Sequence, residues 1–157
     1  METIFATTQG KKSYEERLEM LISRRVEVAD KIRVAREFGD LKENAEYAAA
    51  REEQSNLEDE IASIKEKLPF IKLFSYAKAD TSCVNVGTRV QIEEIATKKK
   101  QEWTITGIIE NDPENFFISN ESPLGKALLG RKVGETIEII KPAGKFKYKV
   151  LKISPGA

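Results

Sequence analysis

The sequence predicts an α+β protein made of an N-terminal antiparallel α-helical coiled-coil hairpin, residues 1–75, and a C-terminal β-rich domain with one short helix, residues 76–157. The first half carries apolar residues at alternating spacings of three and four, which is the pattern of a coiled-coil helix. A glycine near the middle of this half interrupts the pattern once. After Pro69 the pattern changes to short runs of β-branched and aromatic residues separated by turn residues. A chain of 157 residues is long enough for two small units.

The charge balance and the missing histidine exclude several classes of protein. The 26 Lys and Arg residues equal the 26 Asp and Glu residues in number, so the formal net charge is zero. A neutral chain does not hold naked nucleic acid by counterion release alone, although a local cluster of arginines can still contact phosphate. Without histidine the chain lacks the usual general base at neutral pH and the commonest ligand of transition metals. A Ser-His-Asp enzyme and a histidine-bound metal enzyme are therefore excluded.

Sequence features also bear on the compartment. The single Cys83 cannot close an internal disulfide. The segment from Met1 to Thr8 lacks the basic and apolar regions of a signal peptide. No stretch approaches the roughly 20 apolar residues that are needed to span a bilayer. We expect a cytoplasmic protein that makes no contact with a membrane.

The first helix is expected over residues 13 to 38, which corresponds to roughly 39 Å at 1.5 Å per residue. Its apolar seam consists of Tyr14, Leu18, Leu21, Val28, Ile32 and Ala35. Arg25 is the one residue that does not fit this seam. Polar residues at seam positions weaken packing but can fix the register of a coiled coil. We expect this structural role for Arg25.

The second helix ends before Pro69 and carries a matching seam. The seam consists of Tyr47, Ala50, Gln54, Leu57, Ile61, Ile64 and Leu68, in which Gln54 is the polar exception. Two heptad helices of similar length should fold back antiparallel, because neither can bury its apolar stripe alone. The tip of the hairpin is therefore expected near Gly39.

The tip sequence combines a helix stop with a helix start. Gly39 suits the left-handed position after a helix, and Asp40 suits an N-cap. In the structural interpretation, Asp40 and Glu43 form a variant of the capping box and satisfy backbone amides. In the functional interpretation, both carboxylates point off the end of the hairpin, with Glu46 one turn further back, and join a hard cation that another molecule already holds. Two carboxylates alone would bind Mg²⁺ poorly, because this ion prefers a full octahedral shell of oxygen ligands.

Two arginines flank the seam a turn or two below the tip. Arg36 follows Ala35 and Arg51 follows Ala50. Such side chains can hold an RNA phosphate or stack on a base. The alternative is that they are solvated and pair with one of the nearby carboxylates, Glu37, Glu52 or Glu53.

The second half begins with a junction, in which residues 71–76 are extended, and continues as a small sheet. Strands are expected at residues 84–92, 103–109, 116–119, 136–140 and 146–153. A short helix should begin at Pro123, with Ser122 as its N-cap. The three consecutive lysines at residues 98–100 are expected at a solvated hairpin turn.

The tip run AREFGDLKENAEY, residues 35–47, together with residues 49–52, resembles the tip signature of the Gre family of transcript cleavage factors, in its GreA form rather than the more basic GreB form. The resemblance continues at residues 8–10, 122–130 and 133–135, so it spans nearly the whole chain. A run of this length is highly specific.

This resemblance implies a function. The hairpin enters the secondary channel of bacterial RNA polymerase and stimulates cleavage of backtracked RNA by the polymerase itself, so that the protein is no enzyme and has no cofactor of its own. Asp40 and Glu43 match the essential acids of the family, which help to hold the second catalytic Mg²⁺ only together with polymerase. Arg36 and Arg51 match the basic patch that contacts the 3′ segment of the nascent RNA.

The resemblance also implies that the second half has a fold like that of the FK506-binding proteins (FKBP-like) and docks on the polymerase. Ser122, Pro123 and Leu124 are the candidate docking residues. In the alternative, Leu124 simply packs the short helix on the sheet. We expect a monomer, and the resemblance implies DNA binding as well.

Two other functions are consistent with parts of the sequence. An FKBP-like peptidyl-prolyl isomerase or peptide-binding chaperone would require an apolar pocket in which four aromatic side chains converge, namely Trp103, Phe116, Phe117 and Tyr148. It would leave the acidic tip unexplained, and fold alone does not establish function. A relative that blocks the channel without promoting cleavage is the other alternative, and the presence of both Asp40 and Glu43 argues against it.

Overall fold

The computed structural model of the chain describes residues 2–39 and 44–157. Contacts within the chain divide it into two compact units. One unit is Lys11–Phe70, and the other combines the segment up to Gly10 with Ile71–Ala157. Two units were expected from the sequence, but the grouping of the first residues with the second half was not part of that expectation.

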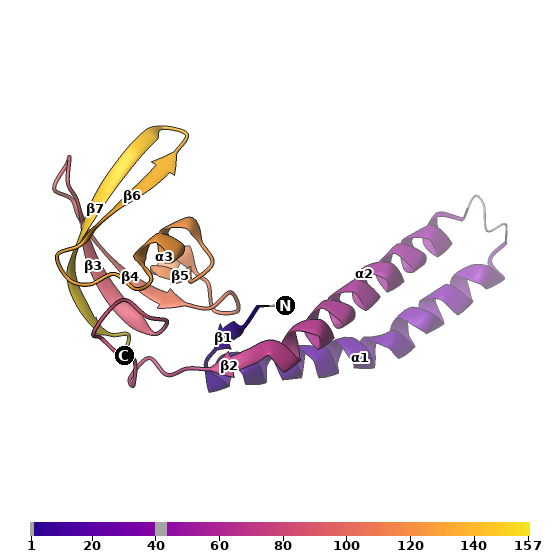
Figure 1. Ribbon diagram of the computed structural model, residues 1–157. Coiled ribbons are helices and arrows are strands. Elements are labelled where there is room, and N and C mark those ends of the chain that lie inside the picture. Colours follow the sequence, from indigo (N-terminus) through magenta and orange to yellow (C-terminus); the bar gives the residue numbers. More distant parts are fainter. Residues whose placement is uncertain (1, 40–43) are drawn as a thin grey trace. The chain divides into compact units, whose positions relative to one another are not determined.

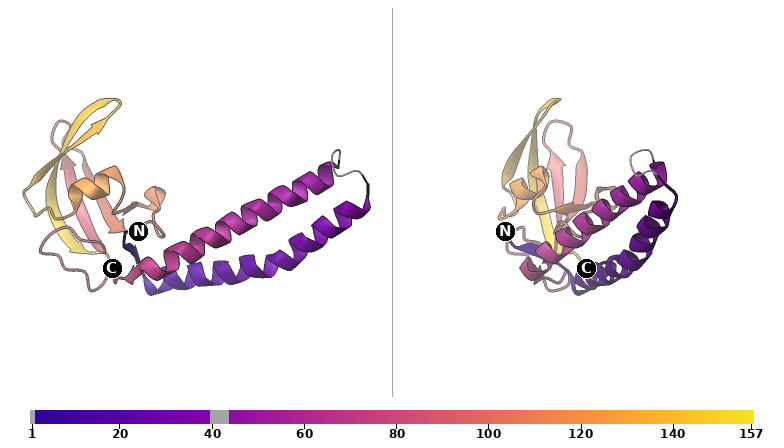
Figure 2. Two further views of the ribbon diagram at one scale, coloured as in Figure 1. Left: turned by 45° about the vertical axis from the view of Figure 1, so that its right-hand side comes forward. Right: turned by 90° about the vertical axis from the view of Figure 1, so that its right-hand side faces the viewer.

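The first unit is a hairpin of two long helices. α1, Thr8–Glu37, and α2, Ala45–Lys67, lie side by side and run in opposite directions (Figures 1 and 2). α1 begins at Thr8 rather than at residue 13, because the Thr7 hydroxyl accepts a hydrogen bond from the Gly10 amide at 3.0 Å and so stabilises an earlier first turn. A short 3-10 helix, η1, Leu68–Phe70, follows α2.

The predicted heptad seam is the core of this hairpin. Its buried members are Leu21, Val28, Ile32, Ala35, Ala50, Leu57, Ile61 and Ile64. Four further apolar residues are half-buried against them, namely Tyr14, Leu18, Tyr47 and Leu68. The heptad prediction is therefore confirmed on both helices.

Ion pairs between the helices accompany the seam. Arg25 donates two hydrogen bonds to the carboxylate of Glu58, at 2.7 and 2.8 Å, so the polar exception in the first seam joins α1 to α2. Arg17 contacts Glu60 at 2.9 Å, further from the tip. Because each pair connects one helix to the other, these contacts disfavour a shift in register.

The second unit contains a mixed sheet of five strands in the order β5-β4-β3-β7-β6 (Figure 1). These strands are β3 Thr88–Glu94, β4 Lys100–Thr106, β5 Phe117–Ser119, β6 Thr136–Lys141 and β7 Gly144–Pro155. Neighbouring strands are antiparallel except β4 and β5, which are parallel. β3 begins later than predicted because the chain turns before it. Thr88 donates its amide to the Asn85 carbonyl at 3.1 Å, and Gly87 has a φ of 96°.

The short helix α3, Pro123–Leu128, contacts β5 and β6, and a second 3-10 helix, η2, Pro113–Asn115, precedes β5. Ser122 caps α3 as predicted, because its side chain accepts a hydrogen bond from the Gly125 amide. The core of this unit is formed by Val84, Val90, Ile92, Ile105, Ile118, Leu128, Ile137, Ile139, Tyr148 and Val150. A helical hairpin and a mixed sheet with one short helix confirm the predicted α+β class. None of the helices that the structure describes is long and apolar enough to cross a membrane.

The first residues of the chain belong to the sheet unit through two kinds of contact. β1, Ile4–Ala6, pairs in parallel with β2, Ile71–Leu73. The carboxylate of Glu110 accepts hydrogen bonds from the amide and the hydroxyl of Thr7 and from the hydroxyl of Thr106. A side chain at Gly107 would overlap the carbonyl of Phe5, so this glycine lets the first strand approach closely. The sequence analysis missed β1, because three residues are too few to show a period.

Candidate functional site

α1 ends at Glu37, close to Gly39, where the sequence predicted the tip of the hairpin. After Glu37 the chain continues through Phe38, whose amide donates to the Ala35 carbonyl at 3.3 Å. Gly39 has a φ of 126°, a backbone conformation that L side chains rarely adopt. This agrees with a glycine that ends a helix.

The start of α2 corrects one part of the prediction. The N-cap of this helix is Asn44 rather than Asp40, since the Asn44 side chain accepts a hydrogen bond from the Tyr47 amide at 3.0 Å and α2 begins at Ala45. The sequence analysis named only Asp40 as an N-cap, although Asn and Asp are equally good in this role. The capping box at Asp40 and Glu43 is therefore not what begins α2. Asp40 and Glu43 themselves lie outside the described residues.

Arg36 and Arg51, which the sequence placed beside the seam, lie close to each other on the hairpin. Both line one groove of about 450 Å³ on the hairpin. The other residues that line it are Ala29, Ile32, Arg33, Glu37 and Gln54. We call this the basic groove, because it presents three guanidinium groups and one carboxylate.

Neither of the two predicted arginines makes the ion pair that the alternative required. The Arg36 guanidinium lies over the ring of Tyr47, 5.7 Å from its centroid, and Arg51 donates to the side-chain oxygen of Gln54 at 3.1 Å. Within residues 2–39 and 44–157, no carboxylate lies within ion-pair distance of either guanidinium. Both are exposed, so no ion pair with a described carboxylate has to be broken before they bind a phosphate.

Arg33 is a residue of this groove that the sequence analysis missed. It lies three residues before Arg36, a spacing that places two side chains on one face of a helix. It contacts Asp30 at 2.8 Å and Glu37 at 2.9 Å, and these hydrogen bonds and charges raise the pKa of its guanidinium. Its spacing to Arg36 was the signal that could have found it.

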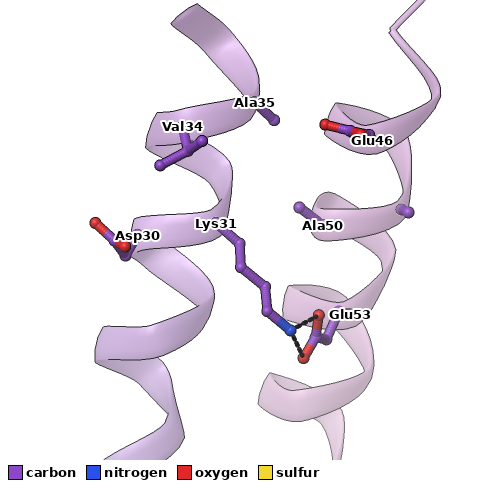
Figure 3. A pocket seen from close by; sticks show the side chains of 8 residues that line it. Asp30, Lys31, Val34, Ala35, Glu46, Ala50 and Glu53 are labelled. Atoms are coloured by element: carbon purple, nitrogen blue, oxygen red, sulfur yellow. Dashed lines mark hydrogen bonds and ion pairs between the residues drawn. The ribbon is translucent and has the colours of Figure 1, made fainter. Parts of the chain in front are cut away.

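The opposite side of the seam carries the opposite charge. A second groove, of about 420 Å³, is lined by Asp30, Lys31, Val34, Ala35, Glu46, Ala49, Ala50 and Glu53. Figure 3 shows the ion pair across it, in which the Lys31 ammonium contacts the Glu53 carboxylate at 3.1 Å. We call it the acidic groove, because three carboxylates and one ammonium group are among the side chains that line it. The half of the hairpin near the tip thus has one basic and one acidic side.

The described residues contain no metal centre of their own. No three His, Cys, Asp or Glu side chains of residues 2–39 and 44–157 come close enough together to hold a metal ion. Glu46, the third acid of the sequence analysis, is exposed on the first turn of α2.

The predicted docking residues lie at the start of α3. Ser122 is occupied by its capping bond and by a hydrogen bond to the Ser119 carbonyl at 2.7 Å. Leu124 packs against the core, as the alternative required, while Pro123 is exposed. Of the three, Pro123 is the one whose side chain is available to a partner.

The four aromatic residues that an isomerase pocket would need do not converge. Trp103 packs edge-on against Phe116 with ring centroids 5.2 Å apart, whereas Phe117 packs against Tyr76. Tyr148 is buried in the core of the sheet unit. These side chains therefore form separate contacts rather than one apolar pocket.

Comparisons with known proteins place this geometry in a family. Residues 4–72 match the family model described as "Transcription elongation factor, N-terminal", and residues 79–155 match "Transcription elongation factor, GreA/GreB, C-term". Transcription elongation factor GreA of Caldanaerobacter subterraneus subsp. tengcongensis is 44% identical over 151 residues, which are 96% of each chain. GreA of Thermoanaerobacter pseudethanolicus is 42% identical over 151 residues, again 96% of each chain.

A solved structure also aligns along the chain. The crystal structure of GreA factor homolog 1 of Thermus thermophilus is 23% identical and covers 97% of this chain and 99% of its own, with a TM-score of 0.45. Membership of the family therefore rests on the matches to the family models and to the two GreA relatives.

Proposed function

This chain belongs to the GreA/GreB family of transcription elongation factors, and from this premise we propose that its helical hairpin enters the secondary channel of bacterial RNA polymerase and stimulates cleavage of backtracked RNA. The proposed result is the rescue of arrested elongation complexes. The bond is broken in the active site of the polymerase, so the chain acts on an enzyme rather than as one.

The observation that carries this proposal is the basic groove beside the tip. Arg36 and Arg51 come from different helices, yet both line this groove and are exposed, which is how cations must be arranged to hold a flexible phosphate chain. The acidic groove lies on the other side of the seam, so the hairpin favours RNA on one side only. A nascent RNA 3′ segment is the proposed occupant of the basic groove.

Asp40 and Glu43 are the residues proposed to promote the reaction. In two-metal phosphodiester hydrolysis, Mg²⁺ lowers the pKa of the attacking water and stabilises the leaving oxygen. The two side chains would contribute carboxylate oxygens to the second Mg²⁺ of the polymerase, and ionised carboxylate is their ordinary state at pH 7. Arg36 and Arg51 would meanwhile keep the RNA beside that ion. This mechanism fits a chain that has no histidine.

The sheet unit is proposed to dock on the polymerase through the start of α3, with Pro123 as the exposed contact. The FKBP-like fold of this unit and DNA binding remain predictions. An isomerase function is not carried forward, because its aromatic residues lie apart.

The test uses a backtracked elongation complex that carries 3′-labelled RNA. The unmodified protein should release labelled dinucleotides and trinucleotides. Asp40→Ala and Glu43→Ala should each abolish stimulated cleavage, a loss larger than the roughly 10- to 100-fold seen when a residue that only orients a metal ligand is lost. Binding to polymerase, measured by competition with the labelled unmodified protein, should change little.

Asp59→Ala is the matched control, because it removes an exposed carboxylate of α2 further from the tip and should leave cleavage intact. Unchanged cleavage in both tip variants would refute the proposed metal role. If the unmodified protein binds polymerase and slows elongation without cleavage, the channel-blocking alternative holds instead.

A further inference from the structure

One side chain joins the two helix ends of the hairpin tip. The Asn44 amide group donates a hydrogen bond to the Ala35 carbonyl of α1 at 2.6 Å, and its oxygen accepts one from the Tyr47 amide of α2 at 3.0 Å. We propose that Asn44 is a positioning residue for cleavage, which holds the helix ends at the separation that the tip acids require. This inference rests on the proposed function.

Only a side-chain amide makes both bonds at once. The last carbonyls of a helix and the first amides of the next one have no partners within their own helices. An asparagine side chain has donors and an acceptor on one planar group, so it can donate to the Ala35 carbonyl, which also accepts the Phe38 amide, and accept from the Tyr47 amide. Serine keeps an acceptor for the Tyr47 amide, but its side chain is too short to span to the Ala35 carbonyl as well.

The anchors of this bridge are themselves held in place. Ala35 is 3% exposed within the seam, so its carbonyl cannot move without disturbing the packing of the helices. Tyr47 packs against the same seam, and its ring lies beneath Arg36. The two hydrogen bonds of Asn44 therefore connect the start of α2 to the seam and, through the ring of Tyr47, to Arg36 of the basic groove.

The sequence between these anchors carries Asp40 and Glu43. When the bridge is lost, α2 keeps an N-cap, but its first turn is no longer tied to the end of α1. We expect the two acids then to support the metal site less well, so the same occupancy of that site needs more Mg²⁺. The Asn44 side chain thus lowers the Mg²⁺ concentration that cleavage needs. It does not change the rate of bond cleavage at saturating Mg²⁺.

Asn44→Ser separates the bridge from the cap. Serine and asparagine are similar as N-caps, so the circular dichroism and melting temperature of this variant should match those of the unmodified protein. The Mg²⁺ concentration for half-maximal cleavage should rise about 5-fold, the factor that one net hydrogen bond represents. The rate at saturating Mg²⁺ should be restored. Asn56→Ser, an exposed amide on the same helix, should change neither value.

Two outcomes would overturn the inference. One is an unchanged Mg²⁺ dependence for Asn44→Ser. The other is a loss of rate at all Mg²⁺ concentrations together with a lower melting temperature, which a merely structural role predicts. The proposed function fails separately, when Asp40→Ala and Glu43→Ala both cleave normally.

A second measurement needs no polymerase. Nitroxide labels attached to the cysteines of Glu37→Cys and Ala48→Cys, in a Cys83→Ser background, report the distance between the two helix ends. Asn44→Ser should broaden the distribution of distances, whereas Asn56→Ser should not. An unchanged distribution in Asn44→Ser would refute the bridge itself.

Discussion

At the level of single residues, the strength with which the basic groove would bind a phosphate depends on which guanidinium groups already contact a carboxylate. Among the residues that the structure describes, Arg36 lies over a tyrosine ring and Arg51 donates to a neutral side chain, whereas Arg33 contacts two carboxylates. A guanidinium that must leave a carboxylate before it binds phosphate contributes less to RNA binding. The three arginines of one groove are therefore not equivalent.

This inequality gives a testable ranking. Arg36→Ala and Arg51→Ala should each weaken crosslinking of the RNA 3′ segment to the factor and lower the slope of its salt dependence by about 0.7, the value for one phosphate contact on a single strand. Arg33→Ala should have a smaller effect. The measurement is crosslink yield in arrested complexes over a series of salt concentrations. Arg17→Ala, at an ion pair further from the tip, is the control, and equal losses in all four variants would contradict the ranking.

The sequence predicted some of these residues and missed others for physical reasons. Arg36 and Arg51 were found because each follows a seam residue, so their position needed only the heptad period. The N-cap was predicted at Asp40 and lies at Asn44, and residue type does not separate the two because Asp and Asn cap helices equally well. The choice depends on the Ala35 carbonyl of the other helix, a contact that no local pattern shows.

At the level of elements, the hairpin depends on a single narrow seam. Ile61 is 2% exposed in this seam, so Ile61→Ala removes buried methyl groups and leaves a cavity. We expect a loss of about 2–5 kcal/mol in the free energy of unfolding. Denaturant unfolding followed by circular dichroism measures it. Val26→Ala is the matched control, because Val26 is 76% exposed, and a similar loss there would contradict the seam as the source of stability.

The ion pair across the seam adds a dependence on pH. The hydrogen bond and charge of Arg25, with a weaker contribution from Lys65, lower the pKa of Glu58 below its ordinary value of 4.5. A carboxylate with a lower pKa in the folded state stabilises the fold above its unfolded pKa, and this stability is lost as pH falls through the folded pKa. The melting temperature of the hairpin should therefore fall as pH drops below about 4.5.

Glu58→Gln isolates this contribution. The variant should melt earlier than the unmodified protein at pH 7, and the difference should shrink as the pH approaches the acid range. Thermal melts at several pH values measure both curves. A constant difference between the two proteins at all pH values would contradict the role of this pair.

Elements defined by a local period were predicted, and elements defined by distant contacts were not. The two heptads fixed α1 and α2 apart from their first turns, and Pro123 after Ser122 fixed the start of α3. The strand β1 was missed because it pairs with β2, which lies far away in the sequence, and the earlier start of α1 depends on a cap by Thr7, a residue that Glu110 also holds.

At the level of the whole molecule, the sheet unit includes the first residues of the chain. Glu110→Ala removes the acceptor of three hydrogen bonds and leaves the amide of Thr7 without its partner. We expect a loss of about 1.5–3 kcal/mol for the docking of this segment, the range for hydrogen bonds to a charged group. Limited proteolysis should then cut near Thr7 sooner, while the helical circular dichroism of the hairpin persists. Glu114→Ala, an exposed acid of η2, is the control, and equal protection of both variants would contradict the prediction.

Because one side of the hairpin is basic and the other is acidic, its rotation about its long axis matters for the proposed function. In the proposed complex, a half revolution about the long axis would bring the acidic groove, with the exposed Glu46, to the place of Arg36 and Arg51, where it would disfavour RNA. Depth of entry alone is therefore not enough for function. A factor that is inserted to full depth but rotated wrongly about its long axis would bring Asp40 and Glu43 to the active site without placing Arg36 and Arg51 against the RNA.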